Sequence, residues 1–310
     1  MKIYLHIGTH KTGSTSIQNV LHKNKEVLIK NGFYYPEVID NHTGQHHLAW
    51  MLIGNDFVNA EKYLSTEVSK AIELNCHSIV LSSEEFEFLN SIERISFFNN
   101  FGEVEVIIML RRQDDFLEAE YNQSVKMPTV RYPKDIFHFY IEKNFSSRIN
   151  YAHLLQNWIT VFKDDAIKIV SYDFERKKRT LLPTFFNLLG LTVDDFPVEK
   201  NYTANVSLPN NALIYLSRLN KDKNIPTNKH LEAINYLSEK FKGSRDSFLD
   251  NELKEILFER YKNMNIKLFH KIDCQLESFY STEVNQRKLI NHYEDFQPDV
   301  YSALLKHLDL

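Results

Sequence analysis

The chain has 310 residues, of which 43% are hydrophobic and 25% are charged, which is the balance of an ordinary soluble globular protein. Its formal net charge of −4 excludes a whole-protein positive field that would attract nucleic acid or an anionic membrane. No stretch approaches the roughly 18 consecutive apolar residues that a membrane span needs. The two cysteines, Cys76 and Cys274, are far apart and lack metal-binding spacing, so we expect reduced thiols in a cytoplasmic protein. The oligomeric state stays open.

The first seventeen residues predict a strand, a glycine-containing loop and the start of a helix. Residues 2–7 are alternating and β-branched, and Gly8-Thr-His-Lys-Thr-Gly13 follows before a helical pattern begins at Ser14. Such a junction gathers unsatisfied N–H groups at a helix N-terminus, where phosphate or sulfate binds. The loop nearly matches the P-loop, G-x-x-x-x-G-K-[ST], but its lysine is Lys11, inside the loop. We therefore predict a site that binds an anion but lacks the lysine after the second glycine, which a kinase or ATPase needs to contact the γ-phosphate.

Helices are expected over residues 14–30 and 61–74, and between them a polar loop enters another helix at His46 and His47. Adjacent histidines on a helix point about 100° apart, so one can face a cleft while the other faces solvent. They lack the i, i+4 spacing of a helical metal site, and no acidic ligand stands beside them. The pair is either structural, with one residue packed and one exposed, or it grips a substrate or moves a proton.

A buried-type strand over residues 78–81 ends in Ser82-Ser83-Glu84-Glu85. Ligands of open parallel sheets lie beyond the carboxyl ends of the strands. A carboxylate here therefore faces the predicted anion-binding loop, Gly8–Gly13 (the anion loop), if this strand is a neighbour of the first strand. Glu84 and Glu85 are therefore candidates for a general base. The alternative is helix capping, in which a serine caps the next helix and the glutamates favour its first turn. Both interpretations hold if one glutamate caps and the other faces the cleft.

A third strong strand, residues 104–110, runs directly into Arg111 and Arg112 at the start of a predicted helix. Burying two arginines at a strand end is costly unless an anion or an acid meets them. One interpretation is therefore a bound anion. The other is a set of salt bridges to acids of the following helix, Asp114, Asp115 or Glu118.

The remaining chain predicts more helices and few chemical groups. A fourth strand, residues 166–172, ends at Tyr172, which is either a core residue or a ligand contact. Strands and helices alternate up to this point, which indicates a parallel sheet with helices on both faces. Residues 200–209 predict an ordered loop, and residues 210–310 are mostly helical. We expect a core over residues 1–220 and a helical C-terminal extension over residues 221–310 packed on it.

The glycine loop and the arginine pair together resemble a known family. His6-Ile-Gly-Thr-His-Lys-Thr-Gly-Ser-Thr-Ser16 is similar to the 5′-phosphosulfate-binding loop of sulfotransferases that use 3′-phosphoadenosine-5′-phosphosulfate (PAPS), and closest to bacterial carbohydrate-type members. In that family an arginine at this strand end binds the 3′-phosphate, with a serine about two helical turns later. Ala119 stands where the serine belongs. The resemblance covers roughly residues 2–220 and implies an α/β fold, a P-loop-like three-layer sandwich with a central parallel sheet flanked by helices.

The resemblance implies transfer of a sulfuryl group from PAPS to a hydroxyl or amine of a carbohydrate or glycolipid-type acceptor, by in-line displacement. Lys11 would stabilise the leaving adenosine 3′,5′-bisphosphate, and Glu84 is our choice of general base, with Glu85 and His47 as alternatives. No metal ion is expected, because Lys11 and the arginines supply the positive charge. The cofactor-binding residues are expected to be His10, Lys11, Thr12, Gly13, Ser14, Thr15, Ser16, Arg111, Arg112 and Tyr172.

Two other function classes stay open. A P-loop nucleotide kinase would use ATP and Mg²⁺, but the displaced Lys11 and the lack of a strand ending in a magnesium-binding aspartate speak against it. A non-catalytic nucleotide- or glycan-binding protein is compatible with the missing serine at position 119. The expected partner is a small-molecule or glycan acceptor rather than a nucleic acid.

Overall fold

The computed structural model describes residues 1–39, 42–197, 207–244, 246–271 and 287–310. These residues form two compact units. The first unit comprises Met1–Arg112, Asn150–Ala204 and Asn263–Thr282, and the second comprises Gln113–Ile149, Asn205–Lys262 and Glu283–Leu310. The units alternate along the chain, so residue 220, the boundary expected from the sequence, lies inside the second unit.

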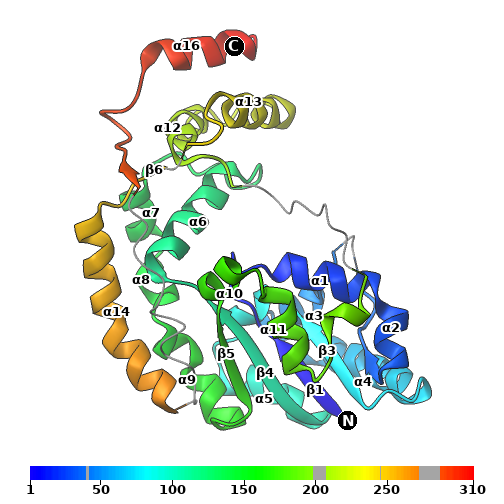
Figure 1. Ribbon diagram of the computed structural model, residues 1–310. Coiled ribbons are helices and arrows are strands. Elements are labelled where there is room, and N and C mark those ends of the chain that lie inside the picture. Colours follow the sequence, from blue (N-terminus) through cyan, green and yellow to red (C-terminus); the bar gives the residue numbers. More distant parts are fainter. Residues whose placement is uncertain (40–41, 198–206, 245, 272–286) are drawn as a thin grey trace. The chain divides into compact units, whose positions relative to one another are not determined.

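A five-stranded parallel sheet lies at the centre of the first unit, with helices on both faces (Figure 1), and confirms the predicted fold class. Its strands are β1 (Lys2–His6), β2 (Phe33–Tyr34), β3 (Ser78–Ser82), β4 (Glu103–Leu110) and β5 (Ile167–Ser171). They follow the order β2-β3-β1-β4-β5. Leu5 of β1 lies opposite Leu81 of β3 and Val106 of β4. Because all pairs are parallel, the segments that follow β1, β3 and β4 leave the sheet at the same edge.

Each face of this sheet packs against its own helices. The helical elements of the first unit are α1 (Ser14–Lys23), α2 (Lys25–Lys30), α3 (His46–Ile53), α4 (Phe57–Glu73), η1 (Glu84–Phe88), α5 (Ile92–Ser96), η2 (Phe97–Asn100), α9 (Tyr151–Phe162), α10 (Tyr172–Lys178), α11 (Leu181–Leu188) and η3 (Val193–Asp195). Ile3 and Leu5 join a buried cluster with residues of α3, α4, α5 and α9. Tyr4 points to the other face and packs with Ile17 of α1 and Phe185 of α11. Each such apolar side chain stabilises the fold by about 1.5–3 kcal/mol when it is fully buried.

Two of the differences from the expected element boundaries have a clear structural reason. The helix expected over residues 14–30 is divided at Asn24, whose backbone leaves the helical region at φ −113° and ψ 28°. The Asn24 side chain donates to the Val20 carbonyl at 2.8 Å and so satisfies the end of α1. Tyr172 begins α10 instead of ending β5, because Ser171 is the last residue of β5 that pairs with β4.

The second unit is mainly helical. Its elements are α6 (Gln113–Lys126), α7 (Ile136–Glu142), α8 (Phe145–Arg148), α12 (Asn210–Leu219), α13 (Thr227–Lys240), β6 (Asp246–Ser247), α14 (Asn251–Lys271, which continues into the first unit), β7 (Lys288–Leu289) and α16 (Pro298–His307). Its core joins Phe116 and Tyr121 of α6 to Leu213 and Leu216 of α12. Among the helices described, none is both long enough and apolar enough to cross a lipid bilayer.

Two expectations concern residues that lie outside the described part of the chain. Most of the ordered loop expected over residues 200–209 lies outside the described residues, and so does Cys274. Cys76 is described, and it is a buried free thiol. The predicted pairing state of Cys274 therefore stays a prediction.

Candidate functional site

The loop after β1 turns through three residues with positive φ. Gly8, Lys11 and Gly13 have φ values of 68°, 63° and 82°. Glycine adopts this left-handed region freely, whereas a residue with a side chain pays about 1–2 kcal/mol. Thr9 fixes the start of the loop, since its N–H and its hydroxyl both donate to the Met109 carbonyl at 3.1 Å. The loop is thus tied to β4 and holds Lys11 in a strained conformation.

The loop leads into the N-terminus of α1. Gly13 occupies the N-cap position and has no side chain that could cap the first turn. The first N–H groups of a helix have no acceptor within it, so a negative group placed here meets both donors and the positive end of the helix dipole. Ser14 is buried, Ser16 is half-buried and Thr15 is exposed. This donor set fits a phosphate or sulfate group.

Glu84 lies directly beside the loop, as the strand order predicts. A Cβ atom on Gly8 would come within 2.9 Å of the Glu84 Cα atom, so the two segments can approach this closely because residue 8 is glycine. Gln18 of α1 donates to Glu84 Oε2 at 2.8 Å. Ser83 accepts a hydrogen bond from the Glu85 N–H at 3.1 Å and caps η1. The capping role expected for one of the two serines is therefore confirmed, and Glu84 stands at the anion loop.

His10 of the loop lies between two other carboxylates of η1. Its N–H donates to Glu87 Oε2 at 3.3 Å, its Nδ1 lies 2.9 Å from Glu87 Oε1, and its Nε2 lies 3.5 Å from Glu85 Oε1. Hydrogen bonding to His10 lowers the pKa of the Glu85 carboxyl, although burial opposes this shift. The sequence-based prediction missed Glu87. Its signal was an acid two residues after Glu85 in a segment otherwise rich in phenylalanine.

Arg111 lies at the end of β4, on the other side of β1 in the strand order. Its Nη1 donates to the Lys11 carbonyl at 3.3 Å, and its Nε lies 3.4 Å from Asp173 Oδ1. Asp173 also accepts a hydrogen bond from the Arg112 N–H at 2.7 Å. An acid therefore does meet Arg111, and it comes from α10. Arg112 is buried, with 3% of its surface exposed.

Tyr172 packs against the end of the anion loop. A Cβ atom on Gly13 would lie 3.2 Å from the Tyr172 ring, and the Arg111 guanidinium lies 5.4 Å from the centre of that ring. This distance is within the range of a cation–π contact. The first residue of α10 thus contacts both the loop and the arginine at the end of β4.

The two histidines of α3 face different neighbours. His46 Nδ1 lies 2.7 Å from the Ser83 hydroxyl, whereas the His47 ring lies edge-on to Tyr63 of α4 at 4.4 Å. Burial lowers the pKa of His46, and the charges of Glu84 and Glu85 act in the opposite direction. His46 is thus the histidine of this pair that lies near the acids after β3. Among the described residues, no three histidine, cysteine or carboxylate side chains are grouped to hold a metal ion.

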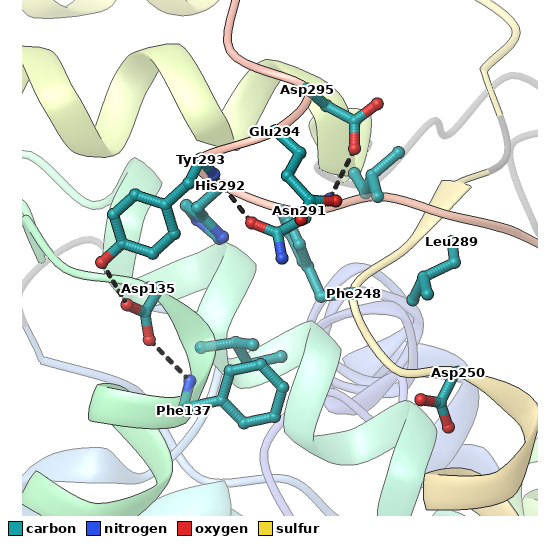
Figure 2. Close-up of a pocket in the computed structure, with 12 residues that line it drawn as sticks. Asp135, Phe137, Phe248, Asp250, Leu289, Asn291, His292, Tyr293, Glu294 and Asp295 are labelled. Atoms are coloured by element: carbon teal, nitrogen blue, oxygen red, sulfur yellow. Dashed lines mark hydrogen bonds between the residues drawn. The ribbon is translucent and has the colours of Figure 1, made fainter.

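A separate pocket of about 270 Å³ lies in the second unit (Figure 2). Tyr293 donates from its hydroxyl to Asp135 at 3.1 Å, and Asp135 also accepts a hydrogen bond from the Phe137 N–H at 3.0 Å. The described residues that line this pocket include none of those predicted from the sequence. Glu84, Arg111 and Tyr172 lie at the loop after β1 instead.

The chain is similar to a protein of known sequence and to a solved structure. An uncharacterized protein of Archaeoglobus fulgidus is 30% identical over 206 residues, which are 62% of this chain and 53% of that protein. The chain therefore spans about half the length of this relative. No family model matches the chain. The crystal structure of a sulfotransferase from Alicyclobacillus acidocaldarius covers 89% of this chain and 97% of its own, with a TM-score of 0.51 and 13% identity. At this low identity the similarity shows a shared fold, so the chain has the α/β fold of a solved sulfotransferase.

Proposed function

We propose that the chain is a sulfotransferase that moves a sulfuryl group from PAPS to a hydroxyl or amine of a carbohydrate or glycolipid-type acceptor. The observation that carries the proposal is the position of the anion loop between a carboxylate and an arginine. β1 lies between β3 and β4, and the loop after it contacts Glu84 through Gly8 and Arg111 through the Lys11 carbonyl. The fold shared with a sulfotransferase of known structure supports the same function.

The donor set of the loop fits the 5′-phosphosulfate of PAPS. The first turn of α1 supplies N–H groups and the hydroxyls of Ser14, Thr15 and Ser16, and Lys11 adds a cation from within the loop. Arg111 and Tyr172 stand together at the Gly13 end of the loop. By the family resemblance these two side chains would bind the 3′-phosphate and the adenine, and Arg112 would assist.

The chemistry assigned to the chain has two parts. PAPS supplies an activated sulfuryl group, whose bond to the bridging phosphate oxygen breaks as a new bond to the acceptor oxygen or nitrogen forms. Lys11 and the loop N–H groups stabilise the negative charge that develops on that bridging oxygen. Glu84 accepts the proton that the acceptor loses, and Gln18 holds its carboxylate in place through the 2.8 Å hydrogen bond. Glu85 is the weaker choice of base because it faces His10, and His47 is weaker because it faces Tyr63.

A transfer assay tests this proposal. The protein is incubated with radiolabelled PAPS and a panel of neutral sugars, amino sugars and glycolipids, in the presence of EDTA. We expect label in at least one acceptor, and a 10²–10⁴-fold loss of transfer in Glu84→Gln, which is the usual contribution of a general base. Glu67→Gln is the control, because Glu67 is more deeply buried than the half-buried Glu84 and hydrogen-bonds Tyr34 of β2, at the edge of the sheet. Tight binding of PAPS without transfer to any acceptor would instead favour a non-catalytic binding protein.

A further inference from the structure

The three acids of η1 divide into two groups by what they face. Glu84 accepts a hydrogen bond from the neutral amide of Gln18. Glu85 and Glu87 both face the imidazole of His10, at 3.5 Å from Nε2 and 2.9 Å from Nδ1. The sequence-based prediction included Glu84 and Glu85 at this strand end and did not include Glu87. Glu85 and Glu87 therefore contact His10 of the loop, whereas Glu84 contacts Gln18 of α1.

Glu87 is the more deeply placed of the two acids that face His10. It is 6% exposed, and its two carboxylate oxygens contact His10 separately, one at the main-chain N–H and one at the ring. This double contact fixes the backbone and the side chain of His10 together, directly before Lys11. A buried carboxylate is also poorly screened by water, so its charge acts strongly on a nearby group.

The charges around His10 favour a proton on its ring. Glu85 and Glu87 of η1 face the ring, and Glu84 lies in the same turn. The positive charges of Lys11 in the loop and of Arg111, which donates to the Lys11 carbonyl, disfavour a proton on the ring. His46 of α3 interacts with Glu84, Glu85 and His10, and a positive charge on His46 would oppose a proton on His10. Carboxylates within about 4–6 Å stabilise the charged form of a histidine. A proton on the ring would offset part of the negative charge that Glu85 and Glu87 place beside the loop.

We propose that Glu87 is a positioning residue that holds His10 as an imidazolium, so that the anion loop presents a second cation beside Lys11 and Glu85 is neutralised. Glu84 is then the carboxylate after β3 that is left to accept a proton from the acceptor. The inference rests on the proposed function for the identity of the anion, adenosine 3′,5′-bisphosphate. The contacts between His10 and the two acids do not depend on that identity.

The first test uses the protein without any ligand. The His10 ring signals are assigned by comparison with His10→Gln and followed by NMR across a pH titration. We expect the midpoint of His10 to lie above that of an ordinary histidine, and to fall by about one pH unit or more in Glu87→Gln, the size of shift that one adjacent charge produces. Glu67→Gln should leave the midpoint unchanged. An ordinary midpoint in the wild type, or an unchanged midpoint in Glu87→Gln, would overturn the inference.

The second test measures the affinity for adenosine 3′,5′-bisphosphate by calorimetry between pH 6 and pH 9. The wild-type affinity should fall as the pH rises through the His10 midpoint, because the bound anion favours the protonated ring. Glu87→Gln should bind the bisphosphate about tenfold more weakly at the lower pH, since one charge contact is worth about 1.4 kcal/mol. The fall in affinity with rising pH should be mostly lost in this variant. Equal pH dependence in the wild type and in His10→Gln would contradict the proposed role.

The outcomes separate this inference from the proposed function. If the bisphosphate does not bind at any pH, the proposed function fails, and the ligand-free NMR titration still decides whether Glu87 holds a proton on His10. If Glu87→Gln does not fold, Glu85→Gln carries the NMR titration of His10 and His10→Gln carries the affinity measurement, because both residues are only partly buried. Glu85→Gln should then lower the His10 midpoint, and a midpoint that does not move would count against the inference.

Discussion

Arg111 at the end of β4 donates to the main-chain carbonyl of Lys11 at 3.3 Å, and this contact joins two neighbouring strand ends at the anion loop. Asp173 lies 3.4 Å from the same guanidinium and holds it in place. Lys11 has a φ of 63°, a conformation that needs support from its surroundings. The arginine therefore has two expected roles, which are to hold the loop in shape and to supply positive charge.

Replacing Arg111 should separate these two roles. Arg111→Lys retains the charge but loses the planar set of donors that reaches both a carbonyl and a carboxylate. We expect it to weaken adenosine 3′,5′-bisphosphate binding about tenfold, and Arg111→Ala to weaken it more, as truncation of a hydrogen-bonded charge typically costs 2–5 kcal/mol. Calorimetry measures both values. Arg94→Ala is the control, because Arg94 binds Asn55 and Asn90 at the surface and should leave the affinity unchanged. Wild-type affinity in Arg111→Ala would exclude both roles.

Removing the Lys11 side chain should abolish most transfer while the fold survives. Lys11→Ala is expected to lower the rate of sulfuryl transfer about 10²–10³-fold, the usual loss when one fixed group that stabilises developing charge is removed. Lys11→Asn is the matched variant, since asparagine tolerates the left-handed backbone region. Its free energy of unfolding should stay within about 0.5 kcal/mol of the wild type, a change typical of neutral surface substitutions. Transfer at the wild-type rate in either variant would refute the catalytic role of Lys11.

A pair of glycine variants tests the close approach of the loop to Glu84. Gly8 and Gly190 have similar φ values, 68° and 75°, but a Cβ atom would meet Glu84 at 2.9 Å in the first case and nothing within 4 Å in the second. Gly190→Ala should therefore cost only the backbone strain, about 1–2 kcal/mol. Gly8→Ala should cost clearly more, because it adds a backbone clash, and it should also weaken anion binding. Urea unfolding compares the two, and equal losses would show that the segments can separate freely.

The pH dependence of stability should contain a contribution from His6. This residue is fully buried with its Nδ1 2.7 Å from the Ser82 hydroxyl, and burial lowers its pKa to about 4. An unfolded histidine has a pKa of about 6.5, so between these values the unfolded chain binds a proton that the folded chain does not. The stabilising contribution of neutral His6 is therefore complete above about pH 6.5 and is lost as the pH falls toward 4.

His6→Gln removes this titration but retains a side chain that can hydrogen-bond Ser82. Between pH 6.5 and pH 4.5, the wild type should lose stability more steeply than the variant, by at most about 1.4 kcal/mol per pH unit. Urea unfolding at three pH values in this range measures the difference in slope. Parallel pH profiles would show that His6 does not resist protonation in the folded state.

The sequence predicted the parts of the fold that depend on local pattern. The strand, glycine loop and helix at the start of the chain carry unambiguous signals, and the strand ends at Glu84 and Arg111 follow runs of buried-type residues. Their arrangement around β1 could be inferred because parallel strands present their carboxyl ends at one edge. The division of the chain into two interleaved units could not, because the chain leaves the first unit after Arg112 and returns at Asn150 through contacts that no local pattern records.

The partners of the site residues were also beyond a single sequence. His10 and Glu87 are 77 positions apart, and their contact depends on how η1 folds back over the loop. Asp173 reaches Arg111 because β5 ends at Ser171 and Tyr172 starts a helix. Acids of the following helix, which are nearer along the chain, were one of the two alternatives predicted from the sequence for that arginine. Long-range contacts of this kind decide which of several nearby acids takes which role.

A calorimetric competition measures whether the loop from Gly8 to Gly13 binds adenosine 3′,5′-bisphosphate. The wild type and Lys11→Ala are titrated with this bisphosphate in EDTA, and then with ATP in the presence of Mg²⁺. We predict tight metal-independent binding of the bisphosphate by the wild type, weaker binding by Lys11→Ala, and little affinity of either protein for ATP. A preference for ATP with Mg²⁺ would contradict this binding role of the loop and favour a nucleotide kinase.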